Sequence, residues 1–353
     1  MLSRDKNKIT YLHFIMSVLV ILIHSINNDT KFERFFSIDS GIGQFAVPLF
    51  FIISGFLFFR NIKSVDEAMY KVRKRVYTLL IPYLLWNLIY YTIHLFLKPG
   101  CGISINEIFN AAFTHKYNPS FWFVYQLILL SAISPFAFIL LNTRLAAKRI
   151  PIFCIGILIC IVAEVFIMLG IDIPYINEDA FIYYFFGLVM ADLYNKGYLL
   201  FIRKKNILIC IVLFTMAYIF NRYTYKLLLR NPIYYQLFTS TVVLVRLCGA
   251  MVLFYLFDLI FSYERVPKYM AQTFFLYAIH YMIVKAMIIM MKFVMYMFLP
   301  VGIVIGFCDL YTIVECITFV ISPAVCVIIN YHLSIFMMKK FGKQYSILVG
   351  NRK

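Results

Sequence analysis

Two histidines in the first apolar segment have the spacing that most directly suggests chemistry. His13 and His24 are eleven residues apart, so a helix brings both to one face, roughly 16 Å apart along its axis. Neutral imidazole accepts a proton near pH 7. One stripe with two such groups therefore predicts a polar path inside a helix bundle. The alternative is a pair of histidines that only form hydrogen bonds within the bundle.

A dense run of cations precedes the third apolar segment. Arg73, Lys74 and Arg75 stand just before the apolar residues that begin at Leu79. Guanidinium and ammonium groups at this density can hold the phosphates of a nucleotide-like donor. A charge run that sets membrane orientation and touches lipid headgroups is the competing interpretation.

Further polar residues interrupt the apolar segments. Ser54 and Gly55 follow Pro48 in the second segment and permit the close approach of another helix. His280 lies in the inner half of a later segment. Ionisable residues inside a membrane are expensive, and they are usually functional or internally paired. Three more of them have no partner that the sequence identifies: Glu164, Arg246 and Lys285.

Composition restricts the class of protein that must position these residues. The 353 residues are 63% hydrophobic and only 14% charged, whereas soluble domains carry about 25% charged residues. The mean hydropathy is +0.86. These values exclude a disordered chain and an ordinary soluble enzyme, and they indicate a membrane-embedded protein. The eight cysteines are scattered without metal-type spacing, so no metal site is expected.

The apolar segments predict an all-α, polytopic fold with about ten transmembrane helices in a single domain over residues 1–353. A membrane helix needs about 20 mostly apolar residues, and strand-like alternation is absent. The predicted spans are 9–27, 42–59, 77–97, 121–141, 151–170, 180–195, 205–220, 236–257, 272–293 and 312–335.

The distribution of charge predicts the orientation of these spans. One set of helix ends carries 23 of the 33 Lys and Arg residues, and the opposite set carries 8. By the positive-inside rule both termini are expected in the cytoplasm. The net charge of +17 is thus explained mostly by residues that set the orientation of the spans. The expected partner is a lipid bilayer rather than nucleic acid, and the expected location is the plasma or inner membrane.

The order and spacing of several short stretches resemble the integral-membrane acyltransferase 3 family over nearly the whole chain. These stretches are 11–25, 45–57, 73–86, 120–127, 185–187 and 275–281. The resemblance implies transfer of an acyl group, most simply acetyl, from cytoplasmic acyl-CoA to a hydroxyl of a cell-surface polysaccharide or lipid-linked glycan. Acyl-CoA is then a co-substrate, and no permanently bound cofactor is expected.

The resemblance also implies roles for individual residues. His24 becomes the candidate general base that activates the acceptor hydroxyl, and Arg73, Lys74 and Arg75 become candidate ligands of the CoA phosphates. Trp122 is expected to line the acceptor groove, and Ser54 and His280 are expected to serve the acceptor or the structure.

One position departs from the family pattern. His13 stands where the family usually has an arginine, so it keeps a hydrogen-bond donor without a permanent charge. We expect His13 to contact the donor or to orient the path to His24. The departure also keeps open a non-catalytic member of the fold. A transporter or flippase is a further alternative, although no inverted repeat is visible. The sequence does not indicate an oligomeric state.

Overall fold

The computed structural model describes residues 3–25, 41–62, 64–98, 104–140, 152–171, 175–199, 205–298 and 310–351. Within these ranges the regular structure is helical and contains no strand, which confirms the predicted all-α class. Membrane spans favour helices because a helix satisfies its backbone hydrogen bonds internally. The helices are α1 Ser3–His24, α3 Ala46–Phe59, α4 Val65–Arg75, α5 Ile81–Leu97, α6 Ile105–Phe113, α7 Trp122–Leu140, α8 Ile152–Met168, α9 Glu178–Asn195, α10 Asn206–Arg230, α11 Tyr235–Leu256, α12 Thr273–Phe298 and α13 Leu310–Leu348.

Over the described residues each predicted span overlaps a helix, but not every helix has the length and hydropathy that a crossing requires. Among the described residues, eight helical segments are long and apolar enough. The two remaining predicted spans correspond to α8, whose apolar part is short, and to α9, which carries Glu178, Asp179 and Asp192. The chain is therefore a multi-pass membrane protein.

Two helices extend well past the predicted ends of their spans. α10 continues to Arg230 and α13 continues to Leu348, with a non-helical residue at Phe341. Hydropathy marks where a helix leaves the apolar layer, whereas a helix ends where its backbone bonding stops. The basic residues of α10, Arg222, Lys226 and Arg230, recur every four residues on one face. The helix can thus continue into a polar environment.

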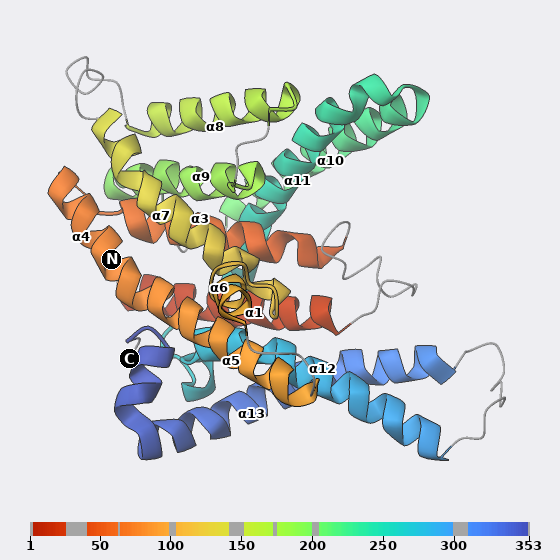
Figure 1. Cartoon of the computed structure of the whole chain (residues 1–353). Helices are drawn as coiled ribbons and strands as arrows, with labels where there is room; N and C mark the ends of the chain where they lie inside the picture. Colours follow the sequence, from red (N-terminus) through yellow and green to blue (C-terminus); the bar gives the residue numbers. More distant parts are fainter. Residues whose placement is uncertain are drawn as a thin grey trace. The chain divides into compact units, whose positions relative to one another are not determined.

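Contacts divide the chain into two compact units. The first unit contains residues 1–5, 47–80 and 122–263, and thus the start of α1 together with α3, α4 and α7 to α11. Within it α8 pairs with α9, and α10 pairs with α11 (Figure 1). The second unit contains residues 6–46, 81–121 and 264–353. It holds α1 from Lys6 onward, α5, α6, α12 and α13, and α12 packs along α13. The expected single domain remains a prediction.

Close packing of α3 against α9 depends on two glycines in the first unit. A Cβ at Gly55 would overlap the carbonyl oxygen of Tyr184, and a Cβ at Gly187 would overlap the backbone of Ile52 and Phe56. Backbone atoms cannot rotate away as the end of a side chain can. Gly55 and Gly187 are therefore required by the approach of the two helices, as small residues are in other membrane bundles.

We expect Gly55→Ala to reduce the free energy of unfolding by about 1–3 kcal/mol, because overpacking forces the backbones apart. The measurement is thermal unfolding of the detergent-solubilised protein. Gly342→Ala is the matched control, since a Cβ there meets no atom within 4 Å. Equal melting temperatures for the two variants would contradict the packing argument.

Candidate functional site

His24, the last residue of α1, lies against two ring side chains of α12 in the second unit. Its ring centroid is 5.4 Å from that of His280 and 5.6 Å from that of Tyr281, which it meets edge-on. The ammonium of Lys285 lies 5.5 Å from the centroid of the Tyr281 ring. The structure thus places His24 beside a second imidazole, a phenol and a cation.

The imidazole of His280 is held by its own helix. The side chain is 1% exposed, and Nδ1 lies 2.6 Å from the carbonyl oxygen of Tyr277. A carbonyl can only accept a hydrogen bond, so Nδ1 is the protonated nitrogen and Nε2 carries the lone pair. Nε2 is buried and has no hydrogen-bond partner among the described residues.

The hydroxyl groups of two tyrosines join α12 to neighbouring segments close to His280. The hydroxyl of Tyr90 on α5 donates to the carbonyl oxygen of Ala278 at 2.9 Å. The hydroxyl of Tyr277 donates to the carbonyl oxygen of Ser120. The ring of Phe121 packs between them, 5.9 Å from Tyr90 and 6.0 Å from Tyr277. These contacts restrict rotation of the helix that carries His280 and Tyr281.

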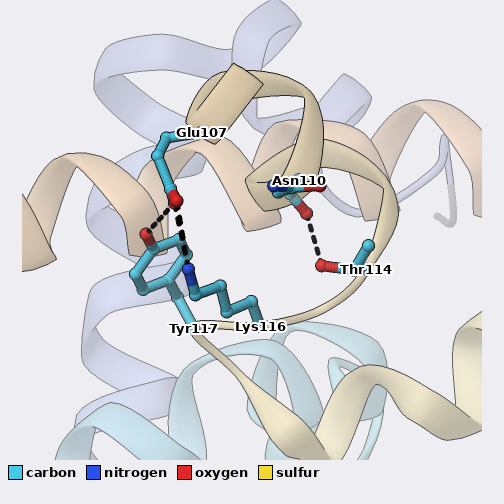
Figure 2. A network of polar contacts seen from close by, with 5 residues as sticks. All are labelled: Glu107, Asn110, Thr114, Lys116 and Tyr117. Carbon is cyan, nitrogen blue, oxygen red and sulfur yellow. Dashed lines mark hydrogen bonds and ion pairs between the residues drawn. The ribbon is translucent and has the colours of Figure 1, made fainter. Parts of the chain in front are cut away.

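The segment that leads to Ser120 is ordered by a polar network (Figure 2). Glu107 on α6 accepts hydrogen bonds from Lys116 at 3.1 Å and from the Tyr117 hydroxyl at 2.9 Å. The Tyr117 ring in turn lies 4.7 Å from His94 of α5. The hydrogen bonds from Lys116 and Tyr117 lower the pKa of the Glu107 carboxyl below its usual value.

His13 shares α1 with His24, and the helix is continuous between them. The predicted common face is therefore consistent with the structure. The side chain is half-buried, and its carbonyl accepts a hydrogen bond from the Ser17 hydroxyl at 2.8 Å. Near this end α1 is attached to the segment before α12, because the Tyr11 hydroxyl donates to the carbonyl of Arg265 at 3.0 Å.

The predicted donor-binding cations form the last turn of α4 in the first unit. Arg73 and Lys74 are exposed and Arg75 is half-buried. Lys71, which sequence reasoning did not single out, donates to the carbonyls of Phe58 and Arg60 and so attaches α4 to the end of α3.

The two remaining predicted residues of this unit lie next to packed residues of α3. The Trp122 ring lies 6.1 Å from the ring of Phe51, and Ser54 is half-buried beside the packed Gly55. These contacts suit a structural role. His24, His13 and His280 thus belong to one unit, whereas Arg73, Lys74, Arg75, Ser54 and Trp122 belong to the other.

The structure also assigns partners that the sequence left open. Arg246 of α11 forms an ion pair with Asp179 at the start of α9, at 3.2 Å. Asp179 was missed because it precedes the apolar segment. Tyr281 was missed although it directly follows His280, and nothing in the sequence marks Tyr90. Within the described ranges, no three or more His, Cys, Asp or Glu side chains are arranged to hold a metal ion.

Comparison with protein families gives one match. The model of an acyltransferase domain, that of the acyltransferase 3 family, covers residues 6–331. The match therefore spans both compact units and includes every site residue named above. Neither the curated proteins nor the solved structures gave a match.

We expect Glu107→Gln to lower the melting temperature at pH 7. A carboxyl whose folded-state pKa is lowered stabilises the fold above its unfolded value of about 4.3, and this stabilisation is lost as the pH falls through the lowered pKa. The difference in melting temperature between variant and wild type should thus stay constant while the pH is above that unfolded value and shrink as the pH falls below it. Thermal unfolding at several pH values measures it. A difference independent of pH would contradict this account.

Proposed function

Since the chain belongs to the acyltransferase 3 family and is a membrane acyltransferase, we propose that it moves an acetyl group from cytoplasmic acetyl-CoA. The proposed acceptor is a hydroxyl of a cell-surface polysaccharide or a lipid-linked glycan. The proposal includes a plasma or inner membrane location with both termini in the cytoplasm, as the distribution of Lys and Arg indicates.

The observation that carries this proposal is the position of His24. It lies at the end of α1, in ring contact with His280 and Tyr281, and within the stretch that resembles the first span of the family. A hydroxyl is a poor nucleophile until a base removes its proton, and neutral imidazole suits that role near pH 7. His24 is the proposed base.

The proposed reaction keeps its protons and electrons in balance. His24 takes the proton of the acceptor hydroxyl while the oxygen attacks the thioester carbonyl, and a carbon–oxygen bond forms. The carbon–sulfur bond then breaks, and its electron pair leaves with the CoA sulfur. The protonated His24 returns the proton to that thiolate. The products are the acetyl ester and free CoA.

The proposed donor contacts are made by the end of α4. Arg73 and Lys74 are exposed and thus accessible to phosphates, and guanidinium groups bind phosphate oxygens in pairs. Lys71 holds α4 to the end of α3, which restricts the position of these cations. His13 is proposed as a further contact of the donor or of the path to His24.

A non-catalytic member of the family is a second candidate, and His13 is the observation that favours it. At this position the family pattern has a permanent positive charge, and an imidazole does not supply one at neutral pH. A transporter differs from both, because it moves its substrate without consuming a thioester.

We expect His24→Ala to abolish release of free CoA from acetyl-CoA in the presence of acceptor membranes. Loss of a general base lowers the rate by about 10²- to 10⁴-fold. A thiol-reactive dye measures the release. His332→Ala is the matched control, because His332 is an exposed histidine of α13, and it should retain activity. Wild-type release in the His24 variant would remove His24 from the mechanism.

We expect acetyl-CoA to raise the melting temperature of the purified protein. At 100 times its dissociation constant a ligand adds roughly 2.7 kcal/mol. Free CoA and an unrelated nucleotide show which part of the donor is recognised. The change Arg73→Ala, Lys74→Ala and Arg75→Ala should remove the shift.

The matched control for charge is the triple change Lys339→Ala, Lys340→Ala and Lys343→Ala, which removes the same number of positive charges from the surface of α13. It should leave the shift intact. Absence of any shift with the wild-type protein at millimolar acetyl-CoA would count against the donor proposal and favour the non-catalytic candidate.

A further inference from the structure

One ring nitrogen of His280 has a hydrogen-bond partner, and the other has none among the described residues. The carbonyl of Tyr277 requires the proton to be on Nδ1, so Nε2 is an acceptor. It is buried within a side chain that is 1% exposed, and no described group donates to it. A buried acceptor without a partner has lost its hydrogen bonds to water and has gained none in the fold, which is unfavourable. Such an atom in a native fold therefore calls for an explanation.

The ring of His24 is the group placed to satisfy this nitrogen. Two imidazoles joined by an N–H···N hydrogen bond of about 2.9 Å have centroids separated by that length plus the two ring radii. The observed 5.4 Å between the centroids is close to such a separation. The rings are tilted by 39°, so a hydrogen bond to Nε2 requires the His24 ring to turn about its soft terminal torsion.

We propose that His280 is the positioning residue of this site, its Nε2 accepting the N–H of His24 so that the other ring nitrogen of His24 keeps its lone pair. This inference rests on the proposed function, because it gives the proposed base a single tautomer. In the reaction described above, His280 neither gains nor loses a proton. It also holds the charge of protonated His24 through the same hydrogen bond, as an acceptor partner does in other histidine-based sites.

The surrounding contacts suit a positioning role. The hydrogen bonds from Tyr90 to Ala278 and from Tyr277 to Ser120 hold the turn of α12 that carries His280. The acceptor atom therefore has a defined position before His24 is aligned. A positioning partner that is itself rigid loses little entropy when the hydrogen bond forms.

Two amide variants separate this role from packing. His280→Gln places an amide oxygen near the position of Nε2 and can still accept from His24. His280→Asn places an amide nitrogen near the position of Nδ1 and can donate only to the Tyr277 carbonyl. Both are neutral and polar, so they differ chiefly in which imidazole nitrogen they replace.

The first readout is nitrogen NMR of the ¹⁵N-histidine-labelled protein in detergent, which does not require activity. The six histidines are assigned by single substitutions. We expect one tautomer of His24 in the wild type and in His280→Gln, and a mixture of tautomers in His280→Asn. An unchanged His24 spectrum in His280→Asn would overturn the proposal, whether or not the protein transfers acetyl groups.

The second readout is the kinetics of CoA release. We expect His280→Asn to lower kcat by about ten-fold or more, as loss of an orienting partner does elsewhere, while the KM for acetyl-CoA stays within two-fold. His280→Gln should keep at least a third of the wild-type kcat. Equal loss of kcat and of thermal stability in both variants would show a packing role and overturn the proposal. Loss of the proposed function itself is recognised separately, by a wild-type protein that releases no CoA.

Discussion

The hydrogen bond from Nδ1 of His280 to the carbonyl of Tyr277 is the interaction on which the arrangement of the candidate site depends. It joins a side chain to the backbone of its own helix at 2.6 Å, and it determines which nitrogen remains an acceptor. In an apolar interior a hydrogen bond of this kind is rarely exchanged for water. The ring of His280 therefore has one orientation, and the ring of His24 packs against it.

The same constraint explains why the site is surrounded by tyrosines. A polar atom buried in a membrane bundle needs a partner within the protein. Tyrosine supplies a large apolar ring together with one hydroxyl at its end. Tyr90 and Tyr277 use that hydroxyl to reach carbonyls of Ala278 and Ser120, and their rings fill the space between the helices. The position of the α12 side chains that contact His24 therefore depends on the packing of Tyr90 and Tyr277.

The first unit depends on close packing between helix backbones. Its helices α3 and α9 approach until backbone meets backbone at Gly55 and Gly187, and van der Waals packing then takes the place of the hydrophobic effect. Lys71 closes the end of α3 by binding its carbonyls. The last turn of α4, whose cations we propose to bind the donor, is thereby attached to the packed pair of α3 and α9. The positions of these cations are restricted as a result.

The sequence by itself determined the all-α membrane class of the protein and the places of its long apolar helices along the chain, and it indicated the histidine that we propose as the base. These follow from hydropathy and from the spacing of His13 and His24 along a helix, which are properties of a continuous stretch of chain. It also indicated Arg73, Lys74 and Arg75, because charge density is local. Helix ends were less predictable, as α10 and α13 show, since a helix does not stop where its hydropathy changes.

Only the tertiary structure decided which residues meet. His24 and His280 are separated by most of the chain, Tyr90 comes from a third helix, and no spacing rule connects them. The pairing of Arg246 with Asp179 likewise depends on how two helices pack. The tautomer of His280 depends on a carbonyl three residues earlier in its own helix. Distance, orientation and burial are properties of the packed bundle, and a candidate site is defined by them and not by the identity of its polar residues alone.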